Sequence, residues 1–488
     1  MSDRRWCIMA DASDLVLYNT LSKKEERFVP GHAGRVNMFV CGQTVYDDAH
    51  LGHAKNYINF SVVARWLRHL NYSVMYVQNI TDVDDKIIAR ARESGRDPIE
   101  LARHFESRFL EDMESLDVKR DVDSYPRSHD YIEAIRVQVQ QLLDMGYAYL
   151  LDGDVYYDVS RFKGYTALSG IRIDELARHR IEPKEGKRNP YDFALWKAAK
   201  PGEPSWKIKV SEAGKTAALD GRPGWHIEDT AITSVLFGPQ YDIHGGATDL
   251  IFPHHTNEIA QAEAASGMAP FVRYWMHSGV LKVNGEKMSK SLGNFVRIRD
   301  LLKAHSAEAL RLLVCSTHYR KEIDYTEKLM AAAEKRLRYI YGAFCVFYNM
   351  KESSGAGAAD IDRIAGDLDR KFTAAMNSDL NTSLALTELC AAIESLKAFA
   401  ESHEAADADA KARASEKVLE LAGIFGILRS GAYKTALPED ARRLIAEREA
   451  LRDRKLYMES DAVRDRLLGE YGIVVEDSEY GTIWYRNG

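Results

Sequence analysis

The stretch RVNMFVCGQTVYDDAHLGHAKNYINF, residues 35–60, decides the expected fold. It opens with a mostly apolar run that ends in Cys41, which indicates a buried strand. An amphipathic segment over 56–69 predicts a helix, and SVMYVQNITDVDD, residues 73–85, predicts a second strand followed by another helix. This order of strand, helix, strand and helix predicts an α/β fold built on a parallel sheet with right-handed crossovers.

The composition is that of an ordinary globular protein. The chain has 488 residues, of which 45% are hydrophobic and 28% charged, and its net charge is −7. Because no apolar run could span a bilayer and the N-terminal segment is too weakly apolar for a secretory signal, we expect a cytoplasmic protein. Five scattered cysteines fit a reducing compartment. The acidic balance does not suggest a general nucleic-acid binder, so any RNA contact must use local basic patches.

Shifts in composition divide the chain into segments. The segment 151–224 is rich in Gly, Pro and charge, whereas 242–252, DIHGGATDLIF, returns to a strand, a glycine turn and a helix. We expect a first half of the sheet domain over 1–150, an inserted domain over 151–224, a second half over 225–270, a connecting region over 271–330, a helical bundle over 331–430 and, after a linker, a small α+β domain over 441–488 with one charged helix and a hairpin.

The motif HLGH, His50 to His53, lies between the first strand and its helix. Ligands bind open α/β sheets at the carboxyl ends of the strands, and a helix N-terminus attracts phosphate through its unpaired N–H groups. The two histidines could donate hydrogen bonds to a triphosphate, and Gly52 would permit close approach. By itself, the pattern also fits a loop with two solvated histidines.

A second cationic stretch is EKMSKSLGN, residues 286–294. Lys287 and Lys290, with two serines and a nearby glycine, could clamp phosphates whose charge develops in a transition state. A solvated basic turn has a similar composition. The KMSKS string follows HLGH in the same chain, with sheet-forming sequence between them, and chance explains that pairing poorly.

The stretch FPHHTNEIAQ, residues 252–261, raises the question of a metal site. Pro253 suits the first turn of a helix and Gly267 its C-terminal stop. On that helix His254 and Glu258 share one face, so an imidazole and a carboxylate can converge. Two residues alone do not make a zinc site, because zinc usually needs three or four protein ligands. The pair could equally cap the helix or lie just outside a metal site.

The paired HLGH and KMSKS motifs resemble those of class I aminoacyl-tRNA synthetases, which carry them on a split Rossmann-like fold. Longer blocks narrow the resemblance to the cysteinyl-tRNA synthetase family. They extend from about residue 15 to the C-terminus and include GRPGWHIED (221–229), YDIHGGATDLIFPHHTNEIAQ (241–261), YWMHSGVLKVNGEKMSKSLGNF (274–295) and SDAVRDRLLGEYGIVVEDSEYGTIW (460–484). The resemblance makes 271–330 a stem-contact region with the KMSKS loop, and makes the bundle and the tail tRNA-binding parts.

The resemblance also implies a zinc ion, one per chain, at the floor of the amino-acid pocket. Family members hold it with two Cys, one His and one Glu, which by position are Cys41, Asp229, His254 and Glu258 here. Asp229 stands where the family has cysteine, in WHIED. Aspartate can bind zinc through oxygen, so either the metal is held by this altered set or it has been lost, and we expect retention. The stretch 207–221 is longer than the family's usual loop, and we expect a surface excursion there.

Further roles follow from the resemblance. It places the ATP phosphates on His50, Gly52, His53, Lys287 and Lys290, adenosine beside Gly245, Gly246 and Asp249, and the amino acid in a pocket of Cys41, Gly42, Thr44, Trp225 and His244. His50, His53, Lys287 and Lys290 would be the catalytic residues. In the tail, Tyr457 and Trp484 would stack on anticodon bases, and Asp461 and Arg464 would read base edges.

The resemblance implies a monomeric enzyme that activates L-cysteine with ATP and Mg²⁺ and transfers it to the 3′ end of tRNA(Cys). Two alternatives share parts of the pattern. A ligase that joins cysteine to an amino sugar has the same catalytic half but is shorter and lacks the anticodon-binding part. A non-catalytic RNA-binding paralogue would have a decaying metal site, of which Asp229 would be the first sign.

Overall fold

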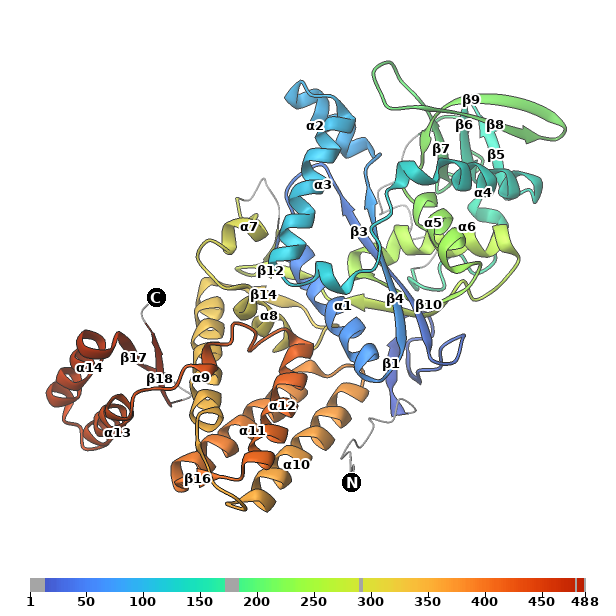
Figure 1. Cartoon of the computed structure of the whole chain (residues 1–488). Helices are drawn as coiled ribbons and strands as arrows, with labels where there is room; N and C mark the ends of the chain where they lie inside the picture. The colour runs from blue at the N-terminus through green and yellow to red at the C-terminus, as the bar shows by residue number, and fades with distance from the viewer. Residues whose placement is uncertain (1–13, 172–183, 289–292, 479–480, 487–488) are drawn as a thin grey trace. The chain divides into compact units, whose positions relative to one another are not determined.

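A computed structural model describes residues 14–171, 184–288, 293–478 and 481–486 (Figure 1). The chain divides into two compact units. One runs up to Lys282 and includes Lys287–Asp300 and Tyr319–Ile323, and the other comprises Val283–Glu286, Leu301–His318 and the chain from Asp324 onward. Among the described residues, none of the helices combines the length and apolarity that a membrane crossing requires.

The first unit is built on a four-stranded parallel sheet with the order β11–β10–β3–β4, which confirms the predicted α/β fold (Figure 1). The strands are β3 (Arg35–Thr44), β4 (Ser73–Thr81), β10 (Tyr241–Ala247) and β11 (Val272–Ser278). Helix α1 (Leu51–His69) connects β3 to β4. The prediction of an amphipathic helix over 56–69 was wrong in two respects, because α1 starts earlier, at the His50 cap, and most of its residues up to Leu67 are buried.

Two adjacent glycines in β10 fix how the sheet is covered. A Cβ on Gly245 would lie 2.3 Å from the Phe60 ring of α1, and a Cβ on Gly246 would lie 2.7 Å from the His255 ring. Successive residues of a strand point to opposite faces, so α1 covers one face and the segment that carries His255 covers the other. The predicted glycine turn was therefore wrong, because both glycines lie inside the strand where two rings approach its backbone.

The inserted segment forms a five-stranded antiparallel sheet with the order β5–β6–β7–β9–β8. Its strands are β5 (Ala148–Leu151), β6 (Asp154–Tyr157), β7 (Phe193–Ala198), β8 (Trp206–Glu212) and β9 (Lys215–Pro223). Helix α4 (Ile132–Asp144) packs on this sheet, with Val139 and Leu142 in the same core as Trp196. The stretch 207–221 is more than a surface excursion, because Ile208, Val210 and Leu219 of the β8–β9 hairpin are buried.

The other elements of the first unit are β1 (Val16–Asn19), β2 (Lys24–Arg27), α2 (Asp85–Ser94), α3 (Pro98–Ser115), α5 (Ile227–Phe237) and α6 (Thr256–Ser266). Near the boundaries of the two units the chain forms β12 (Leu281–Val283), β13 (Glu286–Lys287), α7 (Ile298–Leu301) and β14 (Ile323–Tyr325).

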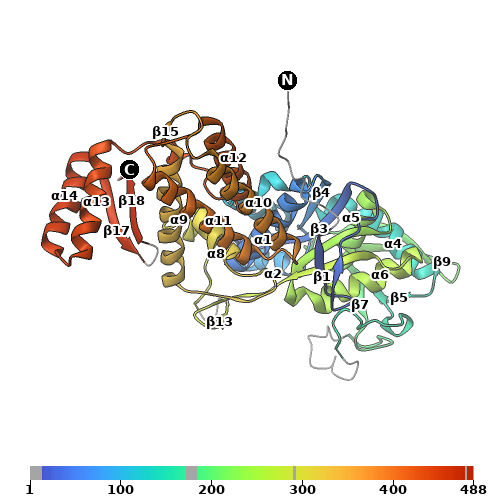
Figure 2. The same cartoon turned by 90° about the horizontal axis from the view of Figure 1, so that it is seen from below.

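The second unit is mainly helical (Figure 2). Its helices are α8 (Ala307–Cys315), α9 (Glu327–Tyr348), α10 (Ala358–Asn377), α11 (Thr382–Ser402), α12 (Ala408–Phe425), α13 (Glu439–Asp453) and α14 (Tyr457–Tyr471), and its strands β15 (Lys351–Glu352), β16 (Ala405–Ala406), β17 (Ile473–Ser478) and β18 (Gly481–Arg486). The predicted tail hairpin is β17–β18. The single predicted tail helix was wrong, because α13 and α14 are separated by a turn in which Lys455 has φ +59°.

Candidate active site and metal centre

A cavity of about 360 Å³ lies at the carboxyl ends of β3 and β4 in the first unit. The chain leaves β3 for β4 on one side, while β10 pairs with β3 on the other, so the cavity occupies the point where the strand order reverses. Many of the predicted site residues line it together: Cys41, Gly42, Thr44, His50, Gly52, His53, Trp225, Asp229, Asp249, His254 and Lys287.

The HLGH motif lies between β3 and α1, as predicted, and its two histidines cap the helix. The Gly52 N–H donates to His50 Nδ1 at 3.0 Å, and the His50 N–H donates to His53 Nδ1 at 3.3 Å. The two rings stack with centroids 3.9 Å apart. Because each Nδ1 accepts a hydrogen bond, each ring carries its proton on Nε2. Burial, with smaller contributions from His50 and Lys86, lowers the pKa of His53 well below its usual value and keeps that ring neutral.

Lys287, the first lysine of the KMSKS motif, belongs to the solvent-facing part of the site. Lys287 Nζ lies 3.6 Å from Asp249 Oδ2, and the Lys287 side chain is 73% exposed. Lys290 lies outside the described residues, so its predicted role remains a prediction. The exposed position of Lys287 leaves its ammonium group available to an incoming phosphate.

At the other end of the cavity, four buried side chains form a candidate metal centre. They are Cys41 from β3, His254 and His255 from the turn before α6, and Glu258 from the first turn of α6. One donor atom from each lies within 4.8 Å of the others. Helix α6 starts at Thr256 rather than at Pro253, yet His254 Nε2 still approaches Glu258 Oε1 to 3.1 Å, as the four-residue spacing predicted.

Both imidazoles of this centre turn their Nε2 atoms toward the other metal-binding groups. His255 Nε2 lies 3.1 Å from Cys41 Sγ, while its Nδ1 lies 2.8 Å from His277 Nε2. His254 uses its Nδ1 toward His226 Nδ1, at 2.9 Å. Outer histidines thus hold both rings with Nε2 facing inward, which is the orienting arrangement that metal-bound histidines use.

Asp229 extends from the start of α5 into the same centre. Its Oδ2 lies 3.1 Å from His254 Nε2 and 3.4 Å from Cys41 Sγ. Its Oδ1 accepts a hydrogen bond from Asn79 Nδ2 at 2.6 Å, so one oxygen is fixed by β4 and the other faces the donors. The structure therefore brings together all four predicted ligands, and it adds His255, which the sequence did not single out although it directly follows His254.

The charge balance of the centre fits a bound cation. Both carboxylate oxygens of Glu258 are buried without a hydrogen bond, even though His254 lies close. Burial, followed by repulsion from Asp229 and Glu228, raises the pKa of Glu258 well above its usual value. Burial, followed by repulsion from Asp229, likewise raises the pKa of the Cys41 thiol. A divalent cation among these groups would favour their anionic forms, so the residues present fit a metal.

Three residues predicted for the adenosine site and the amino-acid pocket are not among the described residues that line the cavity. Gly245 and Gly246 are packed against rings on the two faces of the sheet. His244 lies behind Cys41, with Nε2 3.3 Å from its Sγ and Nδ1 2.6 Å from the Tyr241 hydroxyl. Lys86 also lines the cavity, although it was not predicted; its ammonium lies 5.9 Å from the centre of the Trp225 ring. Its place directly after the second predicted strand was the available signal.

The four predicted anticodon residues all lie in the second unit. Tyr457, 54% exposed, and Asp461 and Arg464 follow one another along α14, and Arg464 Nη1 pairs with Asp461 Oδ1 at 2.9 Å. Trp484 on β18 lies against α9, where a Cβ on Gly342 would be 3.4 Å from its indole nitrogen. Tyr457 therefore presents the more open ring for stacking.

The fold and the cavity correspond to known proteins. Residues 27–335 match the family described as tRNA synthetases class I (C) catalytic domain, and residues 371–429 match the DALR domain. The structure is similar to Mycobacterium tuberculosis methionyl-tRNA synthetase in complex with methionyl-adenylate, with a TM-score of 0.56 and 17% identity over 80% of this chain and 89% of that chain. The first unit thus has the catalytic fold of a class I aminoacyl-tRNA synthetase.

Curated relatives narrow the class to one family. A cysteine–tRNA ligase of Thermococcus gammatolerans is 43% identical over 96% of this chain and 98% of its own length. One of Heliobacterium modesticaldum is 42% identical over 97% of this chain and 99% of its own. The chain belongs to the cysteine–tRNA ligase family.

Proposed function

We propose that this protein is an ATP-dependent ligase that charges tRNA(Cys) with L-cysteine. The observation that carries the proposal is the lining of one cavity. HLGH and Lys287 lie at one end, and a buried group of thiol, imidazole and carboxylate side chains lies at the other. One end suits a triphosphate, and the other suits a small substrate that bears sulfur.

The chain's own residues would act mainly by binding and by charge. The substrate carboxylate would attack the α-phosphate of ATP, so no side-chain nucleophile is needed, and ATP would arrive with Mg²⁺. The Nε2–H groups of His50 and His53 would donate to the phosphate oxygens. Lys287 and Lys290 would stabilise the negative charge that builds up as pyrophosphate leaves. The 3′ end of the tRNA would then accept cysteine from the adenylate.

We propose zinc as the ion of the buried centre, held by Cys41, Asp229, His254 and Glu258. When bound, it would supply a soft Lewis acid that takes the substrate thiolate in preference to the hydroxyl of serine. His255 would then hydrogen-bond to the Cys41 sulfur rather than bind the ion. Asp229→Asn should lower the zinc content, measured by plasma mass spectrometry, more than His255→Gln does; the reverse order would make His255 the fourth ligand.

The direct test measures two reactions. The purified protein should catalyse cysteine-dependent exchange between ATP and pyrophosphate without tRNA, and should charge a tRNA(Cys) transcript with cysteine. A well-folded protein that shows no exchange would contradict an enzymatic role. Exchange without charging would favour the amino-sugar ligase, which is not favoured by relatives that match over 96% of the chain, including the tail.

We also propose that α14 contributes to anticodon binding, since Tyr457 exposes its ring beside Asp461 and Arg464. Tyr457→Ala should raise the KM for tRNA(Cys) roughly tenfold, because base stacking on an aromatic ring is lost. Tyr457→Phe should stay close to the original protein, and ATP–pyrophosphate exchange should be unchanged in both variants. An unchanged KM in Tyr457→Ala would remove this residue from the interface.

A further inference from the structure

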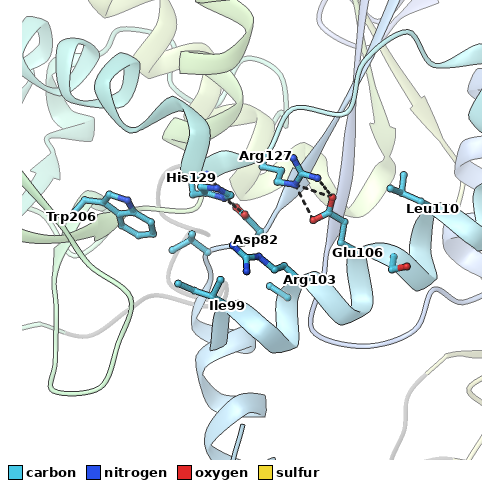
Figure 3. A pocket seen from close by; sticks show the side chains of 11 residues that line it. Asp82, Ile99, Arg103, Glu106, Leu110, Arg127, His129 and Trp206 are labelled. Atoms are coloured by element: carbon cyan, nitrogen blue, oxygen red, sulfur yellow. Dashed lines mark hydrogen bonds and ion pairs between the residues drawn. The ribbon is translucent and has the colours of Figure 1, made fainter. Parts of the chain in front are cut away.

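A second cavity in the first unit has no role in the proposed chemistry (Figure 3). Its volume is about 710 Å³, larger than the catalytic cavity and within the range of roughly 300–1,000 Å³ typical of ligand sites. One wall is a face of α3 with Ile99, Arg103, Glu106 and Leu110, whose spacing places them on the same side of the helix. Figure 3 shows these side chains opposite His129 and Arg127, with Trp206 at one end.

The acidic side chains of this cavity already have partners. Glu106 accepts hydrogen bonds from Arg127 Nε at 2.9 Å and from Arg127 Nη2 at 2.6 Å. Asp82 pairs with the His129 ring and accepts from the His129 N–H at 3.2 Å. Within the part of the chain that the structure describes, Arg103 has neither an ion pair nor a side-chain hydrogen bond, although it lines the same cavity. The Arg103 guanidinium is therefore a cationic hydrogen-bond donor in the wall of the cavity, and such a donor suits an anion.

Trp206 adds a flat apolar surface at one end. It is the first residue of β8, half-buried, with its body packed against the core of the inserted sheet. The structure gives its indole no ring partner and no side-chain hydrogen bond among the described residues. The remaining apolar lining comes from Val83, Ile99, Ala102 and Leu110. A planar aromatic group could stack on this indole, and an adjoining anion could reach Arg103.

The two cavities share one strand. Asn79 and Thr81, at the end of β4, line the catalytic cavity, and the next two residues, Asp82 and Val83, line the second one. A chain-like ligand that reaches the catalytic cavity past the end of β4 would therefore pass the second cavity. The 3′ end that the proposed reaction requires is a chain of this kind, made of planar bases joined by anionic phosphates.

We propose that this cavity is a nucleotide subsite, in which a base stacks on Trp206 and the adjoining phosphate contacts Arg103. The occupant is a nucleotide of the single-stranded 3′ end of the tRNA, so this assignment rests on the proposed function. A free nucleotide presents the same chemistry, and the experiment has a separate arm for it.

The first arm uses the full-length protein and a tRNA(Cys) transcript. Trp206→Ala should raise the KM for tRNA about tenfold, whereas Trp206→Phe, which keeps a stacking face, should stay within about twofold of the original. Arg103→Ala should raise the same KM and reduce the slope of log KM against log salt by about one, because one phosphate contact is lost. ATP–pyrophosphate exchange should be unchanged in all three variants, which shows that each has folded. Arg96→Ala, at an exposed arginine before α3, is the matched control and should change nothing.

The second arm measures the binding of labelled CMP by equilibrium dialysis, with a non-hydrolysable cysteinyl-adenylate analogue occupying the catalytic cavity. If CMP binding depends on Trp206 while the KM for tRNA does not, the subsite is upheld and its occupant is a free nucleotide. If Trp206→Ala and Arg103→Ala leave both tRNA charging and CMP binding unchanged, the subsite is overturned. Absence of cysteine-dependent exchange in the original protein would refute the proposed function instead, and the CMP arm would still decide on the subsite.

Discussion

The two ends of the catalytic cavity differ in how exposed their functional side chains are and in how firmly neighbouring residues hold them. At the metal-binding end, Glu258 is 0% and Cys41 6% exposed, and outer side chains orient both imidazoles and Asp229. At the phosphate end, the Lys287 side chain is 73% exposed, and its Nζ lies 3.6 Å from Asp249 Oδ2. We propose a division of work from this difference: the buried end would select the substrate with fixed groups, whereas the open end would supply charge around the phosphates.

The largest effect is expected from breaking the buried end. His254→Ala should abolish stoichiometric metal binding and lower kcat/KM for cysteine by more than about a hundredfold, because three remaining donors organise the ion poorly. Metal content and exchange at varied cysteine concentration measure both effects, and the KM for ATP should change little. His104→Ala, at an exposed histidine of α3, is the control. Full activity in a metal-free His254→Ala protein would contradict the role of this end.

The open end should respond differently. Lys287→Ala should lower kcat of exchange roughly a hundredfold, the effect of losing one charge contact with the transition state, while the KM for cysteine and the metal content stay the same. Lys282→Ala is a nearby control, since that lysine pairs with Glu322 at 2.6 Å. A change confined to the KM for cysteine would mean that the two ends are not separate in function.

A smaller effect is expected from a change of the proposed metal ligand Asp229. Asp229→Cys should slow the loss of metal to a chelator by roughly tenfold, because a thiolate is a softer ligand than a carboxylate oxygen. Catalysis should be retained, since one anion replaces another. Release measured with a colorimetric chelator provides the readout. Equal release rates in the two proteins would show that residue 229 is not a ligand.

The smallest expected effect concerns pH and the phosphate end. The pKa of His53 is lowered in the folded protein, so as the pH falls below about 6.5 the unfolded chain binds a proton that the folded chain resists. The free energy of unfolding should therefore fall between about pH 7 and pH 5.5. His53→Gln should lose less stability over the same range in urea titrations. An identical pH dependence would mean that His53 is not the neutral group described above.

Much of this architecture could be predicted from local pattern. The strand before Cys41 and the approach of His254 to Glu258 each follow from residues close in sequence. The start of α1 at the His50 cap was not predicted. The role of His255 could not be predicted, because its ring is aimed by His277 of another strand. The glycines of β10 were assigned to a turn because glycine permits turns, whereas packing against Phe60 explains Gly245. Likewise, the sequence gives no sign that Trp206 and Arg103, which are far apart in the chain, line one cavity.

The central claim is that the buried donors select cysteine through a bound metal. The most direct measurement is kcat/KM for cysteine and for serine in ATP–pyrophosphate exchange, before metal removal, after it, and after zinc is returned. The proposed account predicts that cysteine-dependent exchange disappears with the metal and returns with zinc, while serine stays a very poor substrate throughout. A metal-free protein that still activates cysteine and still rejects serine by several orders of magnitude would contradict it.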